Sequence, residues 1–238
     1  MTGSRFPRLV VVGVALVVAA TCVGLGLWQL RRLDERRALN AQIVDRRSAP
    51  PVVIEGVVAG ITPDAYRRAV ARGAYDVEQE VLVFGRNLDG EAGHLVVTPL
   101  VLGDESAILV VRGWVPFAMQ TPPIPRAAPP AGDVTVRGSL VSDEGDGSNT
   151  PDADDVIRVL DVRGIASTLR DDVFPLPLQL QDQAPPQPGS FPVPAPLPEL
   201  SEGPHLSYAF QWFSFAIVAV AGAAVLLRRD RRSPTATP

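Results

Sequence analysis

The chain has 238 residues and a formal net charge of −4, and 46% of its residues are hydrophobic. Residues 31–204 carry 16 arginines against 25 acidic residues, and lysine is absent from the whole sequence. This acidic centre excludes nucleic acid as a partner, because binding a phosphate backbone requires a basic surface. One cysteine and two histidines exclude a disulfide framework and leave too few ligands for a zinc site or a Ser-His-Asp triad.

Residues 9–30 form the first of two apolar segments and contain no charged residue. A helix of about 22 residues covers the roughly 30 Å hydrocarbon core of a bilayer, so we expect a transmembrane helix here. Trp28 and Gln29 end the segment like an interfacial anchor, whereas a cleaved signal peptide has a shorter apolar core that ends in small residues. Cys22, which follows Ala19-Ala20-Thr21, allows the alternative of a lipoprotein signal, although the apolar run continues beyond it.

Residues 206–227 form the second apolar segment, which we expect to be a second transmembrane helix. Four arginines follow it within residues 228–238, and the positive-inside rule places such a cluster in the cytoplasm. With two spans, residues 1–8 then lie in the cytoplasm as well, and residues 31–204 lie on the outer side. The prediction is a multi-pass protein of the plasma membrane with both termini cytoplasmic and the main domain extracytoplasmic.

The region between the two segments is predicted to form an antiparallel β-rich domain, so the fold class is membrane α+β. Residues 31–46 fit a charged helical extension of the first span, which Pro50-Pro51 ends. Alternating apolar residues predict strands over 80–88, 94–102, 107–115, 134–141 and 176–181, with turns over 87–90 and 103–105. The remaining predictions are a short helix over 161–170, an acidic mobile loop over 142–155 and a proline-rich tether over 182–204.

The stretch 52–72 allows two interpretations. Thr62-Pro63-Asp64, followed by Gly73, fits the start and the end of a helix. The alternation of side chains from Arg68 to Ala74 fits a strand instead. The pattern alone leaves both open.

Motifs typical of enzymes are missing from the sequence. No Walker loop is present, and Gly24 and Gly26 lack the strand-turn-helix context of a dinucleotide site, so we expect them to allow close helix–helix approach. The acidic run 152–155 lacks the glycine and the distal glutamate of an EF-hand loop, so a solvated loop is the simpler interpretation. We therefore expect a protein that is not an enzyme.

His205 stands at the start of the second apolar segment. On a helix, His205, Tyr208 and Trp212 are three and then four residues apart and share one face. An imidazole flanked by aromatic rings at a membrane surface can ligate haem iron, and the alternative is an interfacial aromatic belt with a polar cap. The other histidine, His94, begins an apolar strand and is expected to be structural.

Four segments, in order along the chain, resemble motifs of the Surfeit locus protein 1 family: Gly26–Arg31, Gly93–Leu100, Arg112–Pro116 and His205–Ala216. Their order and spacing match from about residue 20 to residue 220, and the last segment is long and specific. All basic residues are arginine, which fits a GC-rich genome, and the resemblance is to a bacterial, actinobacterial member of the family. The resemblance also favours a strand over a helix for residues 66–76.

The resemblance implies a non-enzymatic assembly factor for haem–copper terminal oxidases, above all cytochrome c oxidase, that helps to deliver haem a to the catalytic subunit. It also implies contact with the lipid bilayer, and with haem a synthase or a respiratory supercomplex. A permanent accessory subunit of the oxidase is the first alternative. An extracytoplasmic sensor is the second, although the short arginine-rich tail would leave it without a cytoplasmic output domain.

The same resemblance assigns residues to a haem site. His205 matches the proposed haem-iron ligand of the family, and Arg31 matches its arginine after Trp-Gln. Arg31 and Arg32 would bind the haem propionates through charge-assisted hydrogen bonds. The aromatic side chains assigned to the site are Trp28, Tyr208 and Trp212. The chain departs from the family at Asp34-Glu35-Arg36-Arg37, where a Trp and a Lys are common.

The central motif, with Arg112, Gly113, Trp114 and Pro116, ends a predicted strand. Its expected role is structural, with Trp114 packing the sheet against the membrane-proximal surface. Docking of a partner protein is the alternative.

Overall fold

The computed structural model describes residues 5–55, 64–103, 106–197 and 199–232. It divides into a helical unit, Met1–Gln42 with Glu199–Pro238, and a β unit, Ile43–Pro198. Predictions for Thr62-Pro63 and for Asp104-Glu105 lie outside the described residues.

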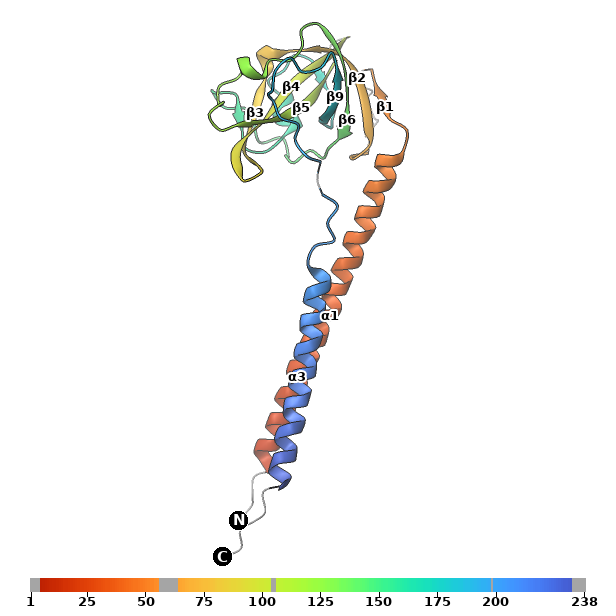
Figure 1. Cartoon of the computed structure of the whole chain (residues 1–238), viewed down its shortest axis with the longest axis vertical. Helices are drawn as coiled ribbons and strands as arrows, with labels where there is room; N and C mark the ends of the chain where they lie inside the picture. Colours follow the sequence, from red (N-terminus) through yellow and green to blue (C-terminus); the bar gives the residue numbers. More distant parts are fainter. Residues whose placement is uncertain (1–4, 56–63, 104–105, 198, 233–238) are drawn as a thin grey trace, which may run out of the picture. The chain divides into compact units, whose positions relative to one another are not determined.

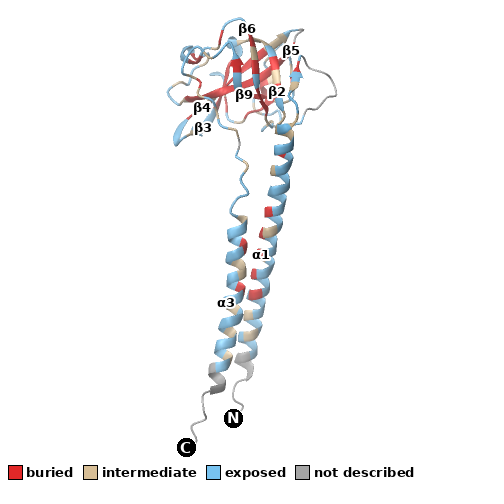
Figure 2. Cartoon of the chain, turned by 45° about the vertical axis from the view of Figure 1, so that its right-hand side comes forward, coloured by how far each residue is buried: buried red, intermediate tan, exposed pale blue. Residues whose placement is uncertain are grey.

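Two long helices, α1 (Arg5–Ser48) and α3 (His205–Arg232), make up the helical unit. Both are long and apolar enough to cross a membrane. The predicted extension over 31–46 is confirmed, because α1 continues without a break to Ser48, just before Pro50. The helices lie side by side and antiparallel (Figures 1 and 2), since the first residue of α3 contacts Gln29 while Ala216 packs against Ala19.

A stripe of small and polar side chains joins the two helices. On α1 the buried positions recur every three or four residues, as in a coiled coil: Ala19, Cys22, Gly26, Gln29 and Leu33. The matching positions on α3 are His205, Ala209, Trp212 and Ala216. A Cβ built at Gly26 would lie 2.6 Å from the Phe213 ring, whereas one at Gly24 would meet nothing within 4 Å. The expected close approach is therefore confirmed at Gly26 and wrong at Gly24.

In the described residues of the β unit, nine strands form one sheet. They are β1 (Val52–Ile54), β2 (Arg68–Tyr75), β3 (Val81–Leu88), β4 (Glu91–Gly103), β5 (Ser106–Pro116), β6 (Asp133–Leu140), β7 (Val156–Ile157), β8 (Asp172–Val173) and β9 (Leu178–Ala184). Short helices lie between them: η1 (Val77–Gln79), η2 (Pro125–Ala127) and α2 (Val162–Ala166). All five predicted strands are confirmed, as is the short helix, and residues 66–76 contain a strand rather than a helix.

The sheet closes on itself, which the sequence did not reveal. Its order is β1-β2-β6-β9-β5-β4-β3-β7, and a further pairing of β2 with β4 makes a ring of β2, β6, β9, β5 and β4. The closing contacts pair Ala74 with Val101 and Tyr75 with Leu100. Gly73 permits them, because a Cβ there would lie 2.0 Å from the carbonyl oxygen of Val101. The glycine thus serves strand closure and not a helix end.

The expectation of an antiparallel sheet is wrong for part of the domain. The central pairs β3–β4, β4–β5, β2–β6 and β6–β9 are antiparallel, but β9 runs parallel to β5, and β1, β7 and β8 also pair in parallel. The long connection from β6 to β9 brings β9 back beside β5 in the same direction. Parallel neighbours require such crossovers, which local patterns do not specify.

The closed ring gives β5 two buried faces. Ile108 and Val110 belong to one core cluster, together with Leu100 and Leu178, while Leu109 belongs to a second cluster. Ile165 of α2 packs in that second cluster. Figure 2 shows the buried residues concentrated in the sheet of the β unit. The continuous apolar run of β5 follows from this double burial.

The prediction of an extended, proline-rich tether over 182–204 is wrong for its first part, which pairs with the sheet. Strand β9 continues to Ala184, and Val193 exchanges two backbone hydrogen bonds with Trp114, of 2.7 and 2.8 Å. The side chain of Gln179 donates to the carbonyl groups of Ala195 and Pro196. The proline-rich segment satisfies polar groups along the sheet, and therefore residues up to 196 belong to the β unit.

Candidate functional site

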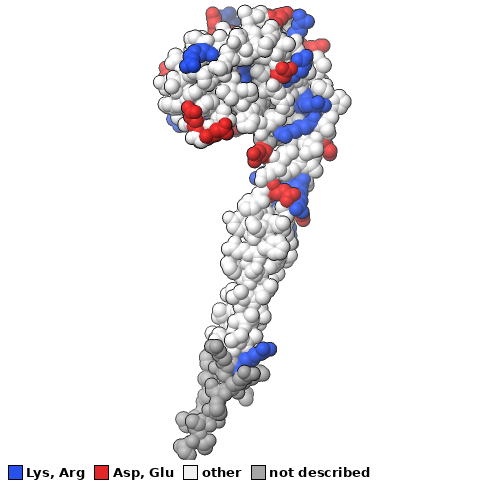
Figure 3. Space-filling view, viewed as in Figure 1, with Lys and Arg blue, Asp and Glu red and all other residues white. Residues whose placement is uncertain are grey.

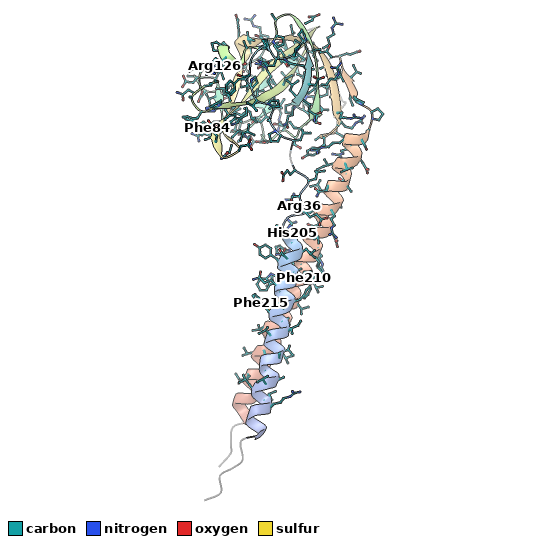
Figure 4. The ribbon with its side chains drawn as sticks, viewed as in Figure 1. Arg36, Phe84, Arg126, His205, Phe210 and Phe215 are labelled. Carbon is teal, nitrogen blue, oxygen red and sulfur yellow. The ribbon has the colours of Figure 1, made fainter. Side chains whose placement is uncertain are left out.

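The first turn of α3 places His205 against α1 in the helical unit (Figure 4). The hydroxyl of Ser207 and the backbone N–H of Tyr208 both donate to the carbonyl of Pro204, which fixes the start of the helix. The Nδ1 atom of His205 lies 2.8 Å from Oε1 of Gln29. Gln29 itself is only 9% exposed. The contact therefore joins residues from the two helices at the end of the pair that we call the His205 end.

The aromatic residues assigned to this site separate into two environments. Trp212 faces α1, packs against the cluster of Ala19, Cys22 and Ala216, and makes an edge-to-face contact with Phe215. Tyr208 and Trp28 are 47% and 52% exposed. His205 and Trp212 therefore lie on the inter-helix stripe, whereas Tyr208 and Trp28 remain on the surface and available to a ligand.

Charged side chains gather near the His205 end of the helical unit. Figure 3 shows that the visible face of the helix pair is otherwise uncharged as far as a basic side chain near its opposite end. Arg32 pairs with Glu35 at 2.6 Å, and Arg37 makes a two-pronged pair with Glu202 at 2.9 and 3.0 Å. Arg31 is exposed and has no ion-pair partner in the described part of the chain. Arg31 thus fits the role of an available cation better than Arg32 does.

The ion pair between Arg37 and Glu202 has a structural consequence for the helical unit. Glu202 precedes α3, and Arg37 lies eight residues beyond Gln29 on α1. The two-pronged geometry is the stronger form of an arginine–carboxylate contact. It holds the segment before α3 against α1, three residues before His205. At Asp34–Arg37, where the chain departs from the family, Arg37 thus supplies a contact between α1 and the segment that leads into α3.

The central motif lies on β5 and is buried. Arg112 donates through Nη1 to Glu80 at 3.1 Å and through Nη2 to the carbonyl of Ala127 and to Gln187. The indole of Trp114 is 5% exposed and donates to the carbonyl of Arg86 at 3.1 Å.

The other two motif residues shape the end of the strand. Gly113 has a φ of +146°, and a Cβ there would lie 2.3 Å from the carbonyl oxygen of Val193. Pro116 ends β5 and is half-buried. Because the polar and aromatic side chains point into the β unit, the geometry favours the packing interpretation over partner docking.

His94 occupies an aromatic pocket in the β unit. It stacks on Phe117 with ring centroids 5.3 Å apart and lies 5.5 Å from Phe84. Burial lowers the pKa of His94, an effect that the backbone of Phe117 offsets only in part. Among the described residues, no group of three or more His, Cys, Asp or Glu side chains is placed to hold a metal ion.

The residue that sequence reasoning missed is Gln29. It was interpreted as part of an interfacial anchor, yet it is the direct partner of His205. Its position three residues after Gly26 on an apolar helix carried a signal, because that spacing puts it on the face that approaches a second helix. Only the pairing of the helices identifies the histidine as its partner.

The protein is thus of a class in which two apolar helices precede and follow a closed, mixed β domain in the sequence. A histidine–glutamine contact joins the two helices. The model of the SURF1 family matches residues 16–217, which is most of the sequence. The chain therefore belongs to the SURF1 family.

Relatives that are similar in sequence come from bacteria and eukaryotes. An uncharacterised SURF1-like protein of Mycobacterium tuberculosis is 30% identical over 228 residues, which cover 90% of this chain and 82% of the relative. A SURF1-like protein of Monosiga brevicollis is 30% identical over 87% of this chain and 83% of its own length. The cytochrome oxidase assembly protein SHY1 of Saccharomyces cerevisiae is 28% identical over 46% of this chain and 29% of its own.

Proposed function

We propose that this chain is a membrane-embedded assembly factor for cytochrome c oxidase, which holds haem a at the His205 end of its helix pair before insertion into the catalytic subunit. The observation that carries the proposal is the oriented imidazole of His205 in a chain of the SURF1 family. The name of the yeast relative supports the link to oxidase assembly.

The surface of the helix pair supports insertion into a membrane. Large apolar side chains point away from the partner helix, among them Leu9 at 72%, Ile217 at 69% and Phe210 at 67% exposed. In water this much apolar surface would be costly, and a bilayer covers it. The arginines after residue 227 orient the pair with both termini in the cytoplasm, so the β unit stands on the outer face of the plasma membrane.

The residues at the His205 end fit haem as a cargo. His205 supplies an imidazole, the commonest protein ligand of haem iron, and Gln29 holds the ring in place. Trp28 directly precedes Gln29, and Tyr208 follows His205 by three residues. Both offer exposed aromatic faces, and Arg31 offers a cation for a propionate. A bound haem a would supply the redox centre that the oxidase needs, and the chain itself supplies binding, orientation and release.

A carrier must also let its cargo go. In the described residues His205 is the sole histidine of the helical unit, and Cys22 lies inside the helix contact. A single imidazole ligand gives moderate affinity, which suits handover to the catalytic subunit. Haem a synthase would supply the cargo, and the exposed β unit would offer surfaces for the oxidase or a respiratory supercomplex.

Purified protein tests the haem site directly. Wild type and His205→Ala are isolated in detergent from cells that make haem a, and their haem content is compared by absorption spectroscopy. We expect wild type to retain haem and His205→Ala to lose most of it. The matched control is His94→Phe, which removes the other histidine and leaves the proposed site intact. Equal haem content in wild type and His205→Ala would remove His205 as the ligand.

Cells test the role in assembly. Deleting the gene should leave an oxidase with reduced haem a content. Wild type, but not His205→Ala, should restore the full haem a content.

Copurification distinguishes an assembly factor from a permanent subunit. A factor is present in substoichiometric amounts in active oxidase, whereas one copy per purified oxidase would favour the accessory-subunit alternative.

A further inference from the structure

In the contact between His205 and Gln29, one atom can be identified as the hydrogen-bond acceptor. The atom of Gln29 that faces the ring is the amide oxygen Oε1, 2.8 Å from Nδ1. A carbonyl oxygen only accepts hydrogen bonds, so this contact is a hydrogen bond in the ring form that carries a proton on Nδ1. In the neutral imidazole the second nitrogen, Nε2, then bears a lone pair and no proton.

The burial of Gln29 favours keeping its amide oxygen as the acceptor for the ring. Gln29 is 9% exposed and lies on the stripe that faces α3, so water has little access to replace its amide as the partner of the ring. An imidazole nitrogen that is shielded from water and left without a partner is unfavourable, which favours keeping the bond. The amide is also uncharged, and it orients the ring without adding a carboxylate to an apolar helix contact.

The opposite edge of the ring faces a glycine. A Cβ built at Gly203 would lie 3.4 Å from both Nε2 and Cδ2 of His205, so any side chain there would stand over the nitrogen that Gln29 leaves unprotonated. Gly203 has a φ of +70°, a conformation that most residues avoid. Within the described chain Nε2 makes no hydrogen bond, and His205 as a whole is half-buried.

We infer that Gln29 is a positioning residue that fixes the proton of His205 on Nδ1, and that Gly203 keeps the Nε2 edge of the ring open for a metal-centred ligand. The two residues act on opposite edges of one imidazole, and neither touches the ligand itself. The identity of that ligand as haem rests on the proposed function, whereas the protonation pattern of the ring does not.

The protonation pattern is measurable without any haem. The chain contains two histidines, so full-length protein labelled with ¹⁵N-histidine gives two ring systems in a nuclear magnetic resonance spectrum, and His94→Phe assigns them. At pH 8 an ordinary imidazole is neutral, and the ¹⁵N shifts then report which nitrogen bears the proton. We expect His205 to be protonated on Nδ1 in wild type.

Two matched variants test the cause. Gln29→Leu removes the acceptor and should give a mixture of both protonation states. Gln211→Leu makes the same change at an exposed position of α3 and should leave the signals as in wild type. A proton on Nε2 in the wild type, or signals of His205 that are unchanged in Gln29→Leu, would overturn the inference.

Binding of ferric haem b, added to the haem-free detergent-solubilised protein, tests the consequence. Loss of such an orienting partner weakens metal binding by about 10–100-fold, so we expect a Kd higher by at least about tenfold for Gln29→Leu. Gly203→Asn should weaken binding while leaving the proton on Nδ1, because Asn tolerates a positive φ and covers Nε2. Unchanged affinity in both variants would contradict the inference.

The haem-site hypothesis and the positioning hypothesis are contradicted by different results. If His205→Ala binds haem as well as wild type, the proposed haem site is wrong, even where the spectra show the proton on Nδ1. If His205→Ala loses haem while Gln29→Leu and Gly203→Asn bind as wild type does, the haem site stands and the positioning role is wrong.

Discussion

Arg112 and Glu80 form an ion pair whose side chains are 0% and 2% exposed, with Nη1 of the arginine 3.1 Å from Oε2 of the glutamate. The other carboxylate oxygen accepts from the backbone N–H of Ile124 at 2.9 Å. Arg112 also donates to Ala127 and Gln187, so one buried pair joins the strands to the connector before β6 and to the segment after β9.

Arg112→Met should destabilise the β unit by about 3–5 kcal/mol, because it leaves the carboxylate of Glu80 buried without its counter-charge. The double variant with Glu80→Leu should lose less than the sum of the two single losses, since the orphaned charge is then removed as well. Urea unfolding of the detergent-solubilised protein, followed by fluorescence, gives both values. Strict additivity would show that the two side chains are not coupled.

Asp161 organises the acidic segment 142–155 from the N-cap of α2. Its carboxylate accepts from the backbone N–H groups of Gly147, Asn149 and Gly164 at 2.8, 3.1 and 2.9 Å. Burial alone raises the pKa of Asp161, but these hydrogen bonds outweigh burial and hold the pKa below its ordinary value. Together with the Arg86–Glu144 pair and the bond from the backbone N–H of Val162 to Asp143, these bonds attach the segment to the domain.

Asp161→Asn should cost about 1–3 kcal/mol of stability at neutral pH, because an amide cannot accept as many bonds from these donors. The folded pKa lies below the unfolded one, so the stabilisation is complete above the unfolded pKa and is lost as pH falls through the folded value. The difference between wild type and variant should therefore shrink from pH 6 toward pH 2. Urea midpoints across this range measure it, and a constant difference would contradict the linkage.

His94 adds a second pH dependence, through its lowered pKa. The unfolded chain takes up a proton near the ordinary value of about 6.5 while the folded chain does not, so stability falls as the pH drops below that value. Neither ring nitrogen has a hydrogen-bond partner within the described residues. His94→Phe should keep the aromatic stack, remain as stable as wild type at pH 8 and unfold at the same urea concentration at pH 6 and pH 8. A variant that is as acid-sensitive as wild type would exclude His94 as the source.

Gly26 and Gly24 provide a matched pair for the helix contact. Gly26→Leu should force Phe213 away from α1 and cost about 1–3 kcal/mol, a range typical of overpacking, because the Cβ alone would lie 2.6 Å from that ring. Gly24→Leu has open space and should leave the melting temperature in detergent within about 1 °C of wild type. Gly26→Leu should also perturb the ¹⁵N signals of His205, which depend on the same contact. Equal melting temperatures for the two variants would show that the helices are not packed at Gly26.

The position of the long strands and of both long helices was predictable from local pattern, whereas the short strands β1, β7 and β8 were not. The predicted strand over 80–88 is β3, Val81–Leu88, and the predicted strand over 107–115 is β5, Ser106–Pro116. Period-two alternation and turn residues act between near neighbours in the sequence, which is why they locate strands well. The apolar runs located both long helices for the same reason.

The sites depend on partners that lie far apart in the sequence. Gln29 and His205 are 176 positions apart, and Glu80 and Arg112 are 32 apart. The tether prediction failed on the same ground: proline content predicts an extended segment but does not reveal that Trp114 offers its backbone groups to Val193. Composition predicts that the proline-rich segment is extended. Its pairing partner is set by the free backbone groups of β5 in the folded sheet.

By itself, the sequence determined that two uncharged apolar helices enclose an acidic β-rich region, and the motifs at Trp28 and His205 determined the family. The tertiary structure alone decided that β2 meets β4 to close the sheet, and that Gln29 is the residue that faces the histidine. The physical reason is that periodicity shows which face of an element is buried but not which element covers it. Packing of the whole chain makes that choice.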